Sequence, residues 1–280
     1  MCEFCTKHGE GKKWYLQVKN YTDELLHEDI SASKKDTIKA TSRLEWTNRF
    51  WQAFMMPAIS GLSSQVRPFA AETLEEEMVE HFGQVLPIED VERVIELVDS
   101  ITRFPCGCRF ITTGKTDKRY CFGIATDKWG GLGRFPDSAS SLEVLSKEEA
   151  KKIFRKYDEE GLMHSIWTGV TPYIVGICNC DRDCAAYRGY IEKTGTPSFF
   201  RAEYICQVDW DLCTGCKSCM SQCQFGAQFY SSALCKVHID PNRCFGCGVC
   251  RTACPEGAIT LLPRKDILEV AELWLKNAPG

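Results

Sequence analysis

Two stretches, CTGCKSCMSQC at residues 213–223 and CFGCGVCRTACP at residues 244–255, decide how the last quarter of this chain folds. In each stretch, spacers of two, two and three residues separate four cysteines. A shift of thirty-one residues superposes all eight cysteines and also brings Asp209 onto Asp240. Thiolates at such short spacings are ligands of iron or zinc, and the repeat predicts two related halves that fold around them.

The eight cysteines resemble the ligand run of bacterial ferredoxins that carry two 4Fe–4S clusters, including Pro255 after the last cysteine. The resemblance covers residues 201–263, and it implies that the fourth cysteine of each run binds the cluster of the other run. The implied ligands are Cys213, Cys216, Cys219 and Cys254 for cluster one, and Cys244, Cys247, Cys250 and Cys223 for cluster two. Gln224 departs from the family, which often has proline there. The alternatives are zinc sites or buried thiols, but zinc ribbons rarely combine three closely spaced cysteines with a distant fourth.

The composition favours a cytoplasmic protein of more than one domain. The chain has 280 residues, 44% of them apolar, and 18 cysteines, so we expect two domains with a sizeable core. We identify no signal peptide and no apolar run of the roughly 20 residues that a membrane span needs. We therefore expect reduced cysteines in the cytoplasm of an anaerobe. Residues 201–263 hold five basic and five acidic side chains; small diffusing ferredoxins are strongly acidic, so this balance favours a fixed position in an assembly.

Residues 1–85 are interpreted as an N-terminal helical segment. Apolar side chains over residues 36–56 recur at a helical spacing that ends at Pro57. Residues 72–82 are typical of an acidic helix that ends at Gly83. The aromatic face of the first helix is expected to be core, with a subunit-docking surface as the alternative.

Cys2, Cys5 and His8 form a pattern that can supply three ligands to zinc or an iron–sulfur cluster. A fourth ligand would have to come from Cys106, Cys108 or a partner chain. The alternative interpretation is two incidental thiols at the end of the chain.

Residues 86–200 are predicted to form a cysteine-containing α+β domain. Apolar residues every three or four positions predict a helix over residues 88–101. A second helix is expected to begin after Ser146, which is placed to form a capping box with Glu149, and to end at Gly161.

Short strands are predicted at residues 162–167 and 173–177. Residues 264–280 are predicted to form an amphipathic C-terminal helix that packs back on the cluster domain or on a partner. Cys206 and Cys235 are interpreted as core thiols. The predicted fold class is thus α+β: a mixed, mainly helical N-terminal domain, a ferredoxin-like domain, and a C-terminal helix.

Six further cysteines are candidates for a third metal centre, an iron–sulfur cluster or zinc: Cys106, Cys108, Cys121, Cys178, Cys180 and Cys184. We expect the backbone to turn at Gly107 and Asn179 so that both cysteines of each closely spaced pair reach one centre. The alternative is a set of buried cysteines that stiffen the fold. The Pro-Cys-x-Cys-Arg and Ile-Cys-Asn-Cys motifs ahead of the ferredoxin run resemble multi-domain iron–sulfur proteins of strict anaerobes. Asp181 and Asp183 interrupt the cysteine run that this group usually has.

These patterns predict an iron–sulfur electron-transfer protein, a relay subunit of a larger anaerobic oxidoreductase, with redox proteins as partners. The alternative is a redox enzyme whose catalytic metal centre lies in the N-terminal domain, where Arg109, Asp181, Arg182 and Asp183 are the polar candidates. We assign no catalytic residue, and the chain has no nucleotide-binding glycine motif. The acidic balance argues against a zinc-dependent nucleic-acid module.

Overall fold

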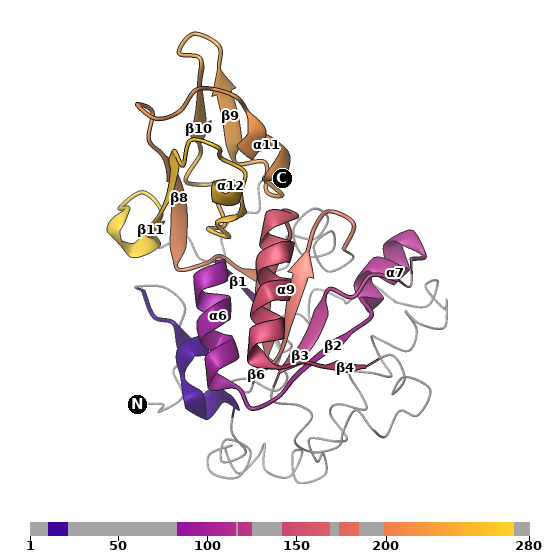
Figure 1. Cartoon of the computed structure of the whole chain (residues 1–280). Coiled ribbons are helices and arrows are strands. Elements are labelled where there is room, and N and C mark those ends of the chain that lie inside the picture. The colour runs from indigo at the N-terminus through magenta and orange to yellow at the C-terminus, as the bar shows by residue number, and fades with distance from the viewer. Residues whose placement is uncertain are drawn as a thin grey trace, which may run out of the picture.

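The computed structural model describes residues 11–21, 83–115, 117–124, 142–168, 174–184 and 199–271 (Figure 1). Cys2, Cys5, His8 and the helices predicted over residues 36–56 and 72–82 lie outside these ranges. In the described part of the chain, no helix is long and apolar enough to cross a membrane. A sheet domain is followed by a smaller C-terminal domain of residues 201–271, and the predicted mixture of helix and strand is confirmed.

The sheet domain is built from short helices and strands that alternate along the chain. In order they are η1 (Trp14–Leu16), η2 (Val18–Tyr21), β1 (Gly83–Leu86), α6 (Ile88–Leu97), β2 (Ile101–Phe104), α7 (Gly107–Thr113), β3 (Cys121–Ile124), β4 (Glu143–Val144), α9 (Lys147–Glu159), β5 (Met163–Thr168), β6 (Ile174–Cys180) and β7 (Phe199–Phe200). The seven strands form one sheet in the order β4-β2-β3-β6-β5-β1-β7. Neighbouring strands are antiparallel except β1 and β7, which are parallel.

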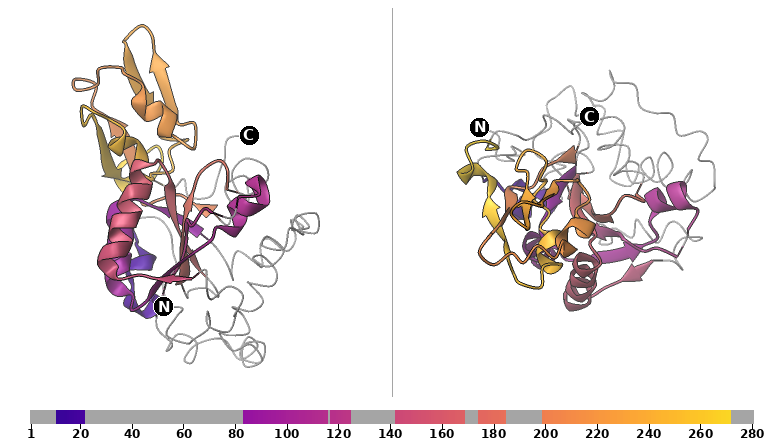
Figure 2. Two further views of the ribbon diagram at one scale, coloured as in Figure 1. Left: turned by 45° about the vertical axis from the view of Figure 1, so that its right-hand side comes forward. Right: turned by 90° about the horizontal axis from the view of Figure 1, so that it is seen from above.

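The two faces of the sheet are covered by different structures. Helices α6 and α9 lie side by side on one face (Figures 1 and 2), where the ring of Phe154 in α9 lies 4.4 Å from that of Phe122 in β3. Because side chains alternate across a strand, the residues next to these core positions point to the opposite face. On that face Met163 and Trp167 belong to an apolar cluster that includes Phe225 of the C-terminal domain. The second domain therefore shares a core with the sheet.

The helix predicted over residues 88–101 is shorter than its apolar pattern. α6 ends at Leu97, Val98 is already extended, and Ile101 begins β2 opposite Ile124. Both Val98 and Ile101 are buried in the same core as the helix. Apolar spacing alone extends the helix too far, because a strand that follows at once buries its residues in the same core.

The predicted capping box at the start of α9 is confirmed. The Ser146 hydroxyl accepts a hydrogen bond from the backbone N–H of Glu149, whose carboxylate accepts one in return from the Ser146 N–H. The chain turns at Gly161 with a positive φ of 81°, as expected for the residue that ends the helix.

Replacing Ser146 with alanine is expected to lower the free energy of unfolding of the sheet domain by about 1 kcal/mol, because it leaves an N-terminal N–H of α9 without its acceptor. Denaturant titration of the anaerobically prepared protein measures the change. Ser146→Thr keeps a hydroxyl at the cap and should retain most of the stability. An equal loss in both variants would show that the cap contributes nothing.

The strand after α9 is confirmed as β5, and the next strand is longer than predicted. β6 runs without interruption to Cys180, so the backbone does not turn at Asn179 as expected. No turn is needed, since residues two apart in a strand point to the same face and Cys178 and Cys180 already lie together. A turn does occur at Gly107, where α7 begins shortly after β2.

The described part of residues 1–85 joins the sheet domain instead of standing apart. Trp14 and Tyr15 are buried in the core beneath α6. The Tyr15 hydroxyl donates to the buried carboxylate of Asp90 over 2.7 Å, and the Trp14 indole donates to Gln84 of β1 over 2.5 Å. Gly83 is the first residue of β1.

The C-terminal domain contains two antiparallel strand pairs and two short helices. Its elements are β8 (Tyr204–Val208), α11 (Ser218–Gln222), β9 (Gln228–Ser231), β10 (Lys236–Ile239), α12 (Val249–Thr252), β11 (Ile259–Pro263) and the 3-10 turn η8 (Arg264–Asp266). β8 pairs with β11 and β9 pairs with β10. Residues 267–271 are turns where a helix was predicted, although Val270 is fully buried in the core of this domain, as packing back on it requires.

Polar contacts fix the C-terminal domain on the sheet domain. Arg251 of α12 forms a two-pronged ion pair with Glu89 of α6 at 2.7 and 2.9 Å. The hydroxyl of Thr252 donates to Asp158 of α9 over 2.5 Å. Both contacts involve α12, which contains Cys250 of the second run, so the sheet domain holds that run directly.

Candidate metal centres

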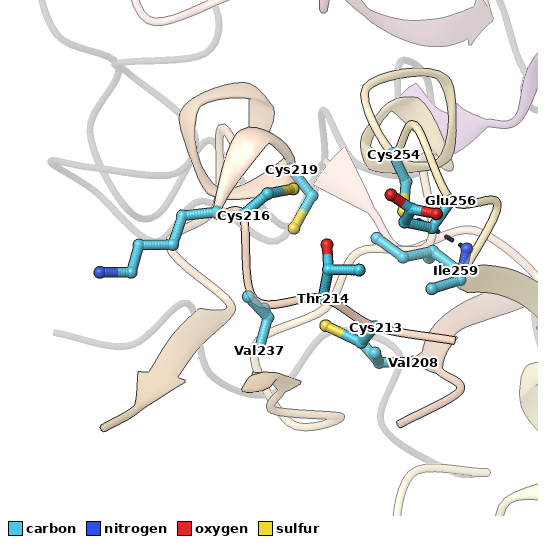
Figure 3. Close-up of a pocket in the computed structure, with 11 residues that line it drawn as sticks. Val208, Cys213, Thr214, Cys216, Cys219, Val237, Cys254, Glu256 and Ile259 are labelled. Carbon is cyan, nitrogen blue, oxygen red and sulfur yellow. Dashed lines mark hydrogen bonds between the residues drawn. The ribbon is translucent and has the colours of Figure 1, made fainter. Parts of the chain in front are cut away.

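Four cysteines surround one cavity of the C-terminal domain, and Figure 3 shows their side chains around it: Cys213, Cys216, Cys219 and Cys254. The cavity encloses about 310 Å³, part of it open to solvent. Val208, Val237 and Ile259 supply apolar walls. Cys216 is exposed, so this cavity reaches the surface of the molecule.

Together with Cys206, the other four cysteines of the two runs line a second cavity of about 300 Å³: Cys223, Cys244, Cys247 and Cys250. Phe225 and Phe245, stacked with their ring centroids 4.1 Å apart, form part of its wall. Cys247 and Cys250 are buried. Each cavity thus takes three cysteines from one run and the fourth from the other.

The repeat of thirty-one residues is reproduced in the backbone. Gly215 and Gly246 directly precede the second cysteine of each run and have φ values of 71° and 74°. A Cβ atom at Gly215 would lie 2.1 Å from the Cys235 carbonyl oxygen, and one at Gly246 would lie 2.0 Å from that of Tyr204. Only glycine fits at both positions, because a side chain would collide with main chain that cannot move away.

Backbone N–H groups point at cysteine sulfur atoms in the same repeat. Ala227 N donates to Cys223 Sγ and Ala258 N donates to Cys254 Sγ, both over 3.3 Å. These are the fourth cysteines of the two runs. Such bonds stabilise a thiolate and lower the electron density on its sulfur.

Burial keeps most of these thiols neutral when no metal is bound. Burial raises the pKa of Cys219 to about 11, and it also raises the pKa of Cys223. At the exposed end, hydrogen bonds from Ser218 lower the pKa of Cys216. Metal binding to such a site displaces protons from the buried thiols, so the bound group would be lost on acidification.

Two buried arginines beside the second cavity were not predicted. Arg264 donates to the carbonyl oxygens of Ala202, Tyr204 and Cys244 at 3.0, 2.8 and 2.8 Å, and Arg201 donates to Cys244 over 3.0 Å. Burial lowers the pKa of both guanidinium groups, that of Arg201 to about 10, with repulsion between the two arginines adding to the effect there. Neither residue belongs to a motif, so no sequence signal identifies them.

The structure also brings together most of the six cysteines of the sheet domain. Cys121 and Cys178 are direct partners on β3 and β6. The thiol of Cys121 lies close to those of Cys106 and Cys178, and the thiol of Cys184 lies close to those of Cys106 and Cys180. The interaction with Cys121 lowers the pKa of Cys106, but the interaction with Cys184 and burial outweigh it and raise the value to about 12. Cys108 is half-buried and packs nearby.

The two cysteines predicted to be core thiols differ. Cys206 is buried and its backbone N–H points at Cys244 Sγ over 3.5 Å. Cys235 is exposed, in the β9–β10 turn with a positive φ of 52°, so the prediction was wrong there. Strand-like sequence surroundings did not reveal the turn.

Arg109 and Asp181, polar candidates from the sequence, form an ion pair of 2.6 Å beside the thiols. Arg109 is only 3% exposed and lies over the Tyr120 ring, 4.2 Å from its centroid. Among the described residues, no three His, Cys, Asp or Glu side chains lie close enough together to share one metal ion. This applies to the thiols of the sheet domain and to both cavities of the C-terminal domain alike.

Comparison with known proteins identifies the C-terminal domain but not the sheet domain. A family model described as a 4Fe-4S binding domain matches residues 206–229 and 237–260, once for each half of the repeat. No curated protein matches the chain. The two matched segments contain all eight cysteines of the two runs. The chain therefore carries a ferredoxin-type 4Fe–4S domain at residues 206–260, with the iron–sulfur electron-transfer role of that domain.

Proposed function

We propose that the chain is a relay subunit of a larger anaerobic oxidoreductase and carries two 4Fe–4S clusters with crossed ligands. Cluster one is bound by Cys213, Cys216, Cys219 and Cys254, and cluster two by Cys244, Cys247, Cys250 and Cys223. The observation that carries this proposal is the division of the eight cysteines between two cavities, three from one run and one from the other.

The surroundings of the two clusters support a direction for the relay. Cluster one lies at the surface, where Cys216 is exposed and Trp210 and Leu212 leave about half of their side-chain surface in water (47% and 52%). Cluster two is enclosed by the core shared with the sheet domain. A redox partner protein would exchange electrons at cluster one, because that is where solvent and a partner can approach.

The sheet domain supplies the other end of the relay. Its cysteines could hold a third centre, an iron–sulfur cluster or zinc, within the same apolar core as two ligands of cluster two. The sixteen cysteines of the described residues are free thiols, which supports a reducing cytoplasm. Cluster ligation by thiolates alone favours reduction potentials in the lower half of the roughly −700 to +450 mV range of iron–sulfur proteins.

Chemical reduction of the anaerobically purified protein, followed by EPR, tests the function. We expect signals from two reduced clusters, with Cys219→Ala removing that of cluster one and Cys250→Ala that of cluster two. Cys235→Ala is a matched control, because Cys235 is an exposed thiol outside both cavities. Unchanged spectra in both ligand variants would contradict the assignment.

A further inference from the structure

Five thiols of the sheet domain lie near one another and come from three separate stretches of chain. They are Cys106 before α7, Cys121 in β3, Cys178 and Cys180 in β6, and Cys184 in the turn after β6. The sheet register brings Cys121 opposite Cys178, while residue alternation places Cys180 on the same face as Cys178. This is the face opposite α6 and α9, since Phe122 and Ile177 point toward those helices.

The turn after β6 returns Cys184 to the other thiols. The backbone N–H of Cys184 donates to the Asp181 carbonyl over 3.0 Å, and that of Asp183 donates to the Asp181 carboxylate over 2.9 Å. Neighbouring thiols then form two series that meet at Cys106: one through Cys121 to Cys178, the other through Cys184 to Cys180. Asp181, which interrupts the cysteine run in the sequence, therefore shapes the turn through its carboxylate.

A buried positive charge adjoins this group of thiols. Arg109 is only 3% exposed, and its Nη1 atom has no hydrogen-bond partner among the described residues. Besides its ion pair with Asp181, it lies near Cys106 and Cys184, whose sulfurs would attract it once they are thiolates. Burying a guanidinium group is costly unless it faces negative charge and acceptors. Asp181 supplies part of that charge and thiolates bound to a metal cluster would add to it, whereas neutral thiols carry no charge and are only weak acceptors.

We propose that this group of thiols binds a third iron–sulfur cluster, with Cys106 as an essential ligand and Arg109 as its charge partner. A structural zinc ion and a 4Fe–4S cluster both take four thiolates, so four of the five thiols suffice for either. No three of them meet at one point among the described residues, as is also true of the two cavities matched to 4Fe–4S binding. This spread fits a cluster, whose ligands are divided among several iron atoms.

The third cluster adjoins cluster two. Cys180 and Cys184 share one apolar core with Cys223 and Cys247. Arg182, between the two groups, donates to the carbonyl oxygen of Cys223 over 3.3 Å. The order along the molecule is thus third cluster, cluster two, cluster one and surface. The ligand set stands on the geometry of the sheet domain, while this order of transfer rests on the proposed relay function.

Iron and acid-labile sulfide per chain, measured on the full chain prepared anaerobically, test the proposal. We expect about twelve irons in the unaltered protein and about eight in Cys106→Ala, with the reduced EPR signals of clusters one and two retained. Cys108→Ala is the matched control in the same segment, and it should keep about twelve irons, because Cys108 is not one of the five grouped thiols. Far-UV circular dichroism verifies that Cys106→Ala keeps its helices.

About eight irons in both the unaltered protein and Cys106→Ala would overturn the third cluster and leave the relay domain intact. Stoichiometric zinc that is lost in Cys106→Ala would overturn its iron–sulfur nature. An equal loss of iron in Cys108→Ala would overturn the ligand assignment. The two proposals fail separately, because Cys219→Ala removes iron from the C-terminal domain and Cys106→Ala removes it from the sheet domain.

Discussion

Cys223→Ala is expected to remove cluster two and to leave cluster one, although Cys223 lies in the first cysteine run. Its side chain lines the second cavity with Cys244, Cys247 and Cys250. Loss of one of four thiolate ligands releases or degrades a cluster, so the variant should lose about four irons. Iron analysis together with EPR of the reduced protein identifies which cluster remains.

Cys254→Ala is the converse variant. Cys254 closes the second run but lines the first cavity, so this substitution should remove cluster one and retain cluster two. Each cysteine accepts a backbone N–H at the same distance, from Ala227 or Ala258, which makes the pair closely matched. If each variant instead lost the cluster of its own run, the crossed ligation would be wrong.

Arg264→Leu is expected to destabilise the C-terminal domain by at least about 2 kcal/mol and to lower the reduction potential of cluster two. Arg264 donates to three carbonyl oxygens, of which that of Cys244 keeps its bond from Arg201. Each of the two buried acceptors left without a partner costs about 1–3 kcal/mol. The same substitution removes a buried positive charge beside Cys244, which makes an added electron less favourable by on the order of tens of millivolts. Denaturant titration and a redox titration followed by EPR measure the two effects.

Lys265→Leu is the control for the loss of charge. Lys265 follows Arg264 in the chain but is exposed, so solvent and salt screen its charge from the cluster. We expect the stability of Lys265→Leu and the reduction potential of its cluster two to stay near those of the unaltered protein. Equal shifts in the two variants would mean that net charge, not the buried arginine, sets the potential.

The cysteine spacing and the caps were predictable because they depend on residues close together in the chain. The two runs, their repeat and the capping box at Ser146 all depend on local backbone geometry. The burial of Arg264 was not predictable, since its three acceptors come from residues up to about sixty positions away and no local sequence pattern indicates them. A buried arginine needs carbonyl oxygens arranged around it, and that arrangement forms only when the chain folds.

In the sheet domain, too, local patterns were predictable and long-range contacts were not. The number of cysteines indicated a metal centre, but their grouping depends on the pairing of β3 with β6 and on the turn that returns Cys184. Strand register is set by long-range packing. The sequence therefore indicates which cysteines are candidates but not which of them lie together. Ile101 illustrates the opposite error, in which a residue of a buried strand continued the apolar spacing of a helix.

The most direct test of the central claim is the amount of iron and acid-labile sulfide bound per chain after anaerobic purification. Two 4Fe–4S clusters in the C-terminal domain require at least about eight irons and eight sulfides, and the third cluster raises both numbers to about twelve. Stoichiometric zinc without labile sulfide would contradict the account, because the eight cysteines of the two cavities would then hold single metal ions and the chain could not carry electrons through them.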